Sequence, residues 1–170
     1  MFAKLAVAAA VVLPFARAHM EMVDPAPLRS QKNPQYKDSP LIDYSYKAPM
    51  DFAGNQFPCK GYVGDVGGVA TAVATVNAGS SFPVQLSGGA VHGGGSCQFS
   101  FSYDMQNFGV VHEIIGNCPM ADQKFDVPIP AEMPSGKNVV FAWTWFNKVG
   151  NREMYMNCES FRVPLIRLGC

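Results

Sequence analysis

Short runs of alternating apolar and polar residues dominate the sequence, and helical periodicity is nearly absent. In the stretch SCQFSFSYD, every second residue from Cys97 to Tyr103 falls on one apolar face, and VVFAWTWFN repeats the pattern from Val139 to Trp145. Glycine and proline separate these runs, as they do in all-β proteins. We therefore predict an antiparallel β-sandwich of the immunoglobulin or fibronectin type III kind, with long surface loops.

The loops of this sandwich can also be located from the sequence. The turn KVGN (148–151) is expected to reverse the second strand into REMYMN, where Glu153 and Tyr155 share one face. The segment from Pro25 to Lys60 holds six prolines and little alternation. We predict that this segment forms long surface loops, which in a compact domain are usually functional or disordered.

The first eighteen residues have the pattern of a secretory signal peptide. Lys4 provides a positive start, residues 5–15 form a short apolar core, and Ala16-Arg17-Ala18 matches the small-x-small cleavage pattern. A buried first helix is the alternative, but the position, flanks and length favour cleavage, and the apolar run is too short to span a bilayer. We expect residues 1–18 to be removed, leaving residues 19–170 as one secreted, extracellular domain without a membrane segment.

The charge of the mature chain argues against nucleic acid as a partner. Loss of Lys4 and Arg17 leaves eleven basic and thirteen acidic residues, a formal charge of about −2. No basic patch or arginine-rich run is present. We expect a monomer that binds no nucleic acid.

Cysteine usage fits an exported protein. In an oxidising compartment, and without a C-x-x-C pair, disulfides are favoured over metal ligation. The count of five is odd, so either Cys170 is unpaired or its partner lies outside the chain. The cysteines are Cys59, Cys97, Cys118, Cys158 and Cys170.

Cleavage before His19 would place two nitrogen donors on one residue, the α-amino group and the imidazole Nδ1. An α-amino group has a pKa of about 7.7–8.0, so a metal ion can displace its proton near neutral pH. Ligation by nitrogen alone favours copper over zinc, calcium or magnesium. One further imidazole would complete the set.

Two other histidines are candidates for this further imidazole ligand. His92 lies in the glycine-flanked loop GGAVHGGGSCQ, where the backbone can approach a ligand closely. His112 lies in the alternating run GVVHEII and is predicted to be a strand residue. Taken alone, each histidine is more often structural than metal-binding, and only its N-terminal position changes this for His19.

Tyr155 and Glu153 are expected on the same strand face, two residues apart. A phenol oxygen can serve as a distant axial group of a metal, and a carboxylate can hydrogen-bond an oxygen species there. From alternation alone, however, the favoured interpretation is a buried tyrosine with a satisfied hydroxyl and a surface glutamate.

Together, five motifs resemble the fungal lytic polysaccharide monooxygenases, specifically the chitin-active group called auxiliary-activity family eleven. The resemblance spans most of residues 19–158, and its last two motifs are long, unusual and in the right order. The motifs are HMEM, PAPLRS, FPCKGY, AVHGGGSCQFSFSYD and AWTWFNKVGNREMYMNC.

This resemblance implies one copper ion in a histidine brace, bound by the amino group and side chain of His19 and the side chain of His92. It places Tyr155 at an axial position, the Ala90 methyl group against the opposite face, and Glu153 beside the metal. The implied reaction is oxidation of a glycosidic carbon, typically C1, in crystalline chitin, with an external reductant and O₂ or H₂O₂. Residues 19–170 would then be a single copper monooxygenase domain acting on an insoluble polysaccharide.

Two alternatives stay open: a copper-binding protein of the same fold without polysaccharide oxidation, and a chitin-binding module without catalysis. Cellulose or another β-glucan is the alternative substrate. For the disulfides we propose Cys97–Cys118 and Cys59–Cys158, although four cysteines allow three pairings and the sequence does not choose among them.

Overall fold

The computed structural model describes residues 19–121 and 123–165, so the expected signal peptide and Cys170 lie outside the described residues. The first sheet has three strands in the order β1-β3-β6: β1 (Met20–Asp24), β3 (Ser81–Gly88) and β6 (Gln123–Pro128). The second has five strands in the order β2-β8-β7-β4-β5: β2 (Ala74–Thr75), β8 (Met154–Val163), β7 (Gly136–Asn147), β4 (Gly95–Ser102) and β5 (Gly109–Ile114).

The main core lies between the two sheets. The register of β4 against β7 sets Phe99 opposite Trp143 and Phe101 opposite Phe141, all on the face that packs toward the smaller sheet. The smaller sheet contributes Leu86, which is fully buried. Among the described residues, the short β2 pairs with β8 in parallel and the other named strands pair antiparallel. The predicted sandwich and its alternating core faces are confirmed.

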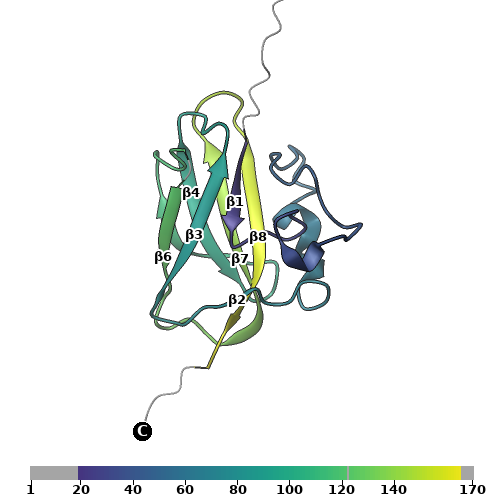
Figure 1. Ribbon diagram of the computed structural model, residues 1–170. Helices are drawn as coiled ribbons and strands as arrows, with labels where there is room; N and C mark the ends of the chain where they lie inside the picture. Colours follow the sequence, from purple (N-terminus) through teal and green to yellow (C-terminus); the bar gives the residue numbers. More distant parts are fainter. Residues whose placement is uncertain (1–18, 122, 166–170) are drawn as a thin grey trace, which may run out of the picture.

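The segment predicted as surface loops packs more tightly than expected. Residues 25–65, here called the loop layer, contain two short 3-10 helices, η1 (Pro34–Tyr36) and η2 (Cys59–Asp65). Figure 1 shows the layer, purple to blue, beside β8. Its buried side chains form a second core with Val140, Ala142 and Met156 of the larger sheet. The segment forms long loops, as predicted, and these loops also cover the outer sheet face, because that face is itself apolar and covering it removes its area from water.

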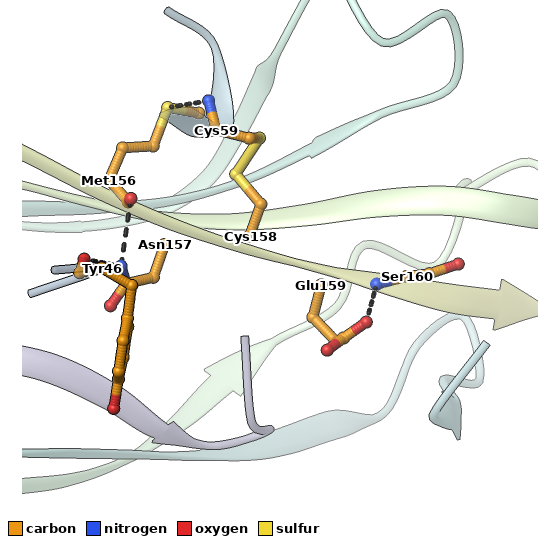
Figure 2. The surroundings of a disulfide bond; sticks show 7 residues. All are labelled: Tyr46, Cys59, Met156, Asn157, Cys158, Glu159 and Ser160. Atoms are coloured by element: carbon orange, nitrogen blue, oxygen red, sulfur yellow. Dashed lines mark hydrogen bonds between the residues drawn. A yellow bond between two sulfur atoms is a disulfide. The ribbon is translucent and has the colours of Figure 1, made fainter. Parts of the chain in front are cut away.

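Two disulfides join these parts. Cys59 of η2 bonds Cys158 of β8, and Cys97 of β4 bonds Cys118, which confirms both proposed pairings. Beside the first bridge, the Cys59 N–H donates to Met156 Sδ at 3.2 Å, as Figure 2 shows. The loop layer is thus tied covalently to the strand that carries Tyr155.

Three chain segments meet at one end of the sandwich. Figure 1 shows the start of β1, the β3–β4 loop and the β7–β8 turn together at the upper end, far from the end of β8. No helix in the described ranges is long and apolar enough to cross a membrane.

Candidate active site

His19 lies directly before β1, and strand pairing brings it to the loop that carries His92. Met20 pairs with Gly88, the last residue of β3, and the chain continues from there through Ala90 to His92. A side chain at Gly88 would put its Cβ 2.3 Å from the His19 carbonyl oxygen, so this approach requires glycine. The pairing of β1 with β3 therefore sets the two histidines at the same end of the fold.

The β3–β4 loop holds His92 in a left-handed backbone conformation with φ of 46°. The Gly94 N–H donates to the Val91 carbonyl at 2.7 Å, which closes the turn around the histidine. From the β7–β8 turn, the Val149 N–H donates to the His92 carbonyl at 2.8 Å. Ala90 is half-buried in the same loop.

Both imidazoles border one aromatic stack. Trp145 and Tyr155 are cross-strand partners whose rings stack with centroids 4.6 Å apart. The His19 ring lies edge-on to Tyr155 and the His92 ring is tilted against Trp145, each pair with centroids 5.9 Å apart. The buried stack thus forms a common support for the two histidines.

Glu153 and Tyr155 also meet at this point. The Tyr155 hydroxyl donates to Glu153 Oε2 at 2.6 Å. Burial raises the pKa of Tyr155 well above its usual value, and the hydrogen bond to Glu153 raises it further. The tyrosine is buried with its hydroxyl satisfied, as alternation predicted, but Glu153 is half-buried beside the histidines and is not a fully exposed surface residue.

The electrostatics of His19 reflect the same neighbours. Burial lowers the pKa of the His19 imidazole, the carboxylate of Glu153 raises it, and the charge of His92 lowers it. On balance the pKa of His19 is lowered, so burial favours the neutral imidazole that a metal ion requires.

These donors fit copper. The cysteines in the described ranges are all in disulfides, so none offers a thiolate. Within residues 19–121 and 123–165, no group of three or more His, Cys, Asp or Glu side chains could hold a metal ion. Two imidazoles need a third donor, and the α-amino group of a processed His19 would supply it, giving a nitrogen-only set. His112, as predicted, is a strand residue: it lies on β5 and stacks on Phe99.

A cavity of about 360 Å³ opens beside Glu153. The loop layer contributes Phe52 and Phe57 to its lining, and β7 contributes Phe146. Phe52 is 98% exposed and Phe57 is 50% exposed. The loop layer therefore presents exposed aromatic rings next to the site.

Sequence reasoning missed Asn147, which is fully buried at the end of β7. It continues the core face of Trp143 and Trp145, so a polar residue falls where the alternation expects an apolar one. That break in the pattern was the available signal.

Solved structures of other proteins share this fold. The domain matches the structure of an AA10 lytic polysaccharide monooxygenase from Streptomyces lividans with a TM-score of 0.60 and 14% identity, over 85% of this chain and 99% of that one. It matches an AA10 lytic polysaccharide monooxygenase from Photorhabdus luminescens with a TM-score of 0.59 and 13% identity, over 85% and 98% of the two chains. The sandwich is therefore that of the lytic polysaccharide monooxygenases.

Comparison with curated sequences finds relatives that are named as members of one family, AA11. The AA11 family lytic polysaccharide monooxygenase A of Aspergillus fumigatus is 46% identical over 146 residues, which are 85% of this chain and 64% of that protein. An AA11 family lytic polysaccharide monooxygenase of Aspergillus oryzae is 34% identical over 182 residues, or 96% of this chain and 40% of that protein. No family model matches the chain. The chain is thus similar in sequence to AA11 family lytic polysaccharide monooxygenases, and it spans less than two thirds of these relatives' length.

Proposed function

We propose that the protein is a secreted, copper-dependent monooxygenase that oxidises C1 of glycosidic bonds in crystalline chitin. The observation that carries this proposal is the meeting of His19 and His92 on the Trp145–Tyr155 stack, with Glu153 hydrogen-bonded to Tyr155. The homology to AA11 family lytic polysaccharide monooxygenases supports it.

Three nitrogen atoms would hold the copper ion: the α-amino nitrogen and a ring nitrogen of His19, and a ring nitrogen of His92. This set exists only after cleavage before His19, because a peptide nitrogen is a poor donor without deprotonation. Copper, when bound and reduced by an external donor, would activate O₂ or H₂O₂ for removal of a hydrogen atom from the sugar.

The residues around the proposed copper site would affect how the co-substrate, O₂ or H₂O₂, binds and reacts there. Glu153 can accept or hold a proton of the co-substrate, since its carboxylate already accepts from Tyr155 at 2.6 Å. Tyr155 stays protonated because burial raises its pKa, so its oxygen would be only a weak donor to the copper ion. Ala90, half-buried in the loop that carries His92, would contribute a methyl group that has no donor or acceptor.

With H₂O₂ the net reaction is balanced without further electrons. One oxygen atom enters the C1–H bond and the other leaves as water. The hydroxylated carbon then expels the glycosidic oxygen, which takes up a proton, and the resulting lactone adds water to give an aldonic acid. With O₂, two electrons and two protons from the reductant are also consumed.

A crystalline substrate requires an exposed face near the metal. The exposed rings of Phe52 and Phe57 provide apolar area beside Glu153 that fits the C–H faces of pyranose rings. Chitin is proposed on the family resemblance.

Product analysis tests this function. The processed, copper-loaded protein is incubated with ascorbate and H₂O₂ on β-chitin and, in parallel, on cellulose, and mass spectrometry detects the released oligosaccharides. We expect aldonic-acid chito-oligosaccharides from the wild type and from H112A, whose imidazole lies on β5, and none from H92A.

The other outcomes of this experiment would each indicate a different function or substrate. Copper binding without oxidised products would indicate a copper-binding protein. Chitin binding without copper would indicate a binding module, and oxidised products from cellulose alone would replace chitin as the substrate.

A further inference from the structure

Asn147 connects two parts of the candidate site that lie on different loops. It is the last residue of β7 and is fully buried, although it is polar. A buried amide without partners is costly, so its hydrogen bonds indicate what the residue does.

All of its side-chain bonds go to the turn that follows. Nδ2 donates to the Val149 carbonyl at 3.1 Å and to the Asn151 carbonyl at 2.5 Å, and Oδ1 accepts from the Glu153 N–H at 2.7 Å. Only this orientation of the amide works, because carbonyls accept and the Glu153 N–H donates. The Asn147 carbonyl also accepts from Arg152 Nε at 2.9 Å.

The turn held in this way has two functional contacts. On one side it ends at Glu153, whose carboxylate accepts from the Tyr155 hydroxyl. On the other side the Val149 N–H donates to the His92 carbonyl at 2.8 Å, and the Lys148 N–H donates to the Gly94 carbonyl at 3.0 Å. One amide therefore bonds both Val149, which holds the backbone of His92, and Glu153.

The strand register adds a further constraint. Asn147 pairs with Gly95, the first residue of β4, directly after the His92 loop. A Cβ at Gly95 would lie 2.1 Å from the Phe146 carbonyl oxygen, so a residue with a side chain would not fit where the loop meets β7. Neither the His92 loop nor the β7–β8 turn can shift without disturbing the other.

We propose that Asn147 is a positioning residue that couples Glu153 to His92 by locking the β7–β8 turn. This inference rests on the proposed function for its catalytic meaning. Outer partners of metal ligands typically change metal affinity or activity by about 10- to 100-fold when they are removed, and we expect a loss of that size here.

The chain offers a matched control in Asn33, a second buried amide. Its Nδ2 donates to the carbonyls of Ala26 and Pro27 and to Glu159, and its Oδ1 accepts from the Gln35 N–H, all away from the turn. The variants N147A and N33A each remove one buried amide with several partners. N147S, which keeps a hydroxyl, replaces N147A if that variant does not fold.

Hydrogen exchange in the copper-free protein gives the first measurement. In the Asn147 variants, both the Glu153 and the Val149 amides should exchange at least about tenfold faster, because the amide group that bonds their turn is gone. In N33A both should match the wild type. Faster exchange at Glu153 alone would overturn the coupling to His92.

Paramagnetic resonance of the Cu(II)-loaded, processed protein gives the second measurement. The copper hyperfine pattern should shift in the Asn147 variants and stay unchanged in N33A, and the kcat of oxidation should fall with little change in KM. A wild-type pattern in N147A, or an equal shift in N33A, would overturn the positioning role. A wild type that binds no copper would contradict the proposed function instead, while the exchange measurement would still test the coupling.

Discussion

The hydroxyl of Tyr155 donates a 2.6 Å hydrogen bond to the carboxylate of Glu153, two residues earlier in the chain. Tyr155 lies in β8 and Glu153 just before it, so the strand fixes one partner and the β7–β8 turn fixes the other. The bond joins a buried aromatic stack to a group that lines the neighbouring cavity. This relationship links the packing of the core to the chemistry proposed at the surface.

Replacing Glu153 by glutamine should lower oxidative activity by about 10- to 100-fold while copper binding is retained. Glutamine can still accept from Tyr155, but it cannot take up a proton. Initial rates of aldonic-acid release and calorimetric titration with copper measure the two properties. Y155F serves as the companion variant, since it removes the donor and keeps the ring stack. Wild-type rates in E153Q would show that the carboxylate has no catalytic part.

The buried carboxyl of Glu159 should make the protein less stable as pH rises. Burial raises its pKa from 4.5 to about 8, although the Ser160 N–H lowers it through a hydrogen bond drawn in Figure 2. Because the folded-state pKa is the higher one, this contribution is complete below about pH 4.5 and is lost as pH rises through about 8.

Urea unfolding between pH 4.5 and 8 measures this effect against E159Q. One proton corresponds to a slope of up to about 1.4 kcal/mol per pH unit in the wild type. The variant should lose that slope, whatever its absolute stability. Parallel pH profiles for the two proteins would contradict the assignment.

The two disulfides should differ in their contributions to stability. Cys59–Cys158 joins residues 99 apart, whereas Cys97–Cys118 joins residues 21 apart. Loop-closure entropy predicts about 4.7 kcal/mol for the first and about 3 kcal/mol for the second. Urea unfolding of the double alanine variants C59A/C158A and C97A/C118A gives both values. A larger loss for the shorter loop would count against this explanation.

Much of the fold could be predicted because half-buried strands have alternating apolar and polar residues in the sequence. The alternation through Phe99, Phe101 and Trp143 identified the core face, and the structure buries all three. The loop layer could not be predicted in the same way. Irregular segments have no hydrophobic periodicity. The burial of Leu28 and Tyr36 on the outer sheet face therefore could not be predicted from the local sequence.

The residues of the candidate site also differ in how far the sequence predicts them. The sequence predicts His19 and His92 as candidate site residues because a cleavage pattern and a glycine-rich loop are local features. The stack of Trp145 on Tyr155 depends on strand register, which spacing alone does not give. For Asn147 the sequence shows only a polar residue on an apolar face, and its role follows from its partners in the turn.

Truncation of Phe52 to alanine should weaken binding to chitin by about 3- to 10-fold, as expected for one ring contact worth about 0.7–1.4 kcal/mol. The ring is 98% exposed, so the substitution leaves the fold and copper affinity unchanged. V69A removes an exposed apolar side chain outside the cavity lining and is the control. Sedimentation binding to β-chitin measures both variants. Equal affinities for F52A and V69A would place the substrate elsewhere.

The central claim is that cleavage before His19 creates the copper ligand. While Ala18 remains attached, the His19 nitrogen is a planar amide and the site has two imidazoles but no amine. The decisive measurement is a Cu(II) titration of two forms of the protein, one with a free His19 and one with a residual Ala18. We predict that the free form binds Cu(II) far more tightly and that it alone oxidises chitin. Equal affinity and equal activity in the two forms would contradict the histidine brace.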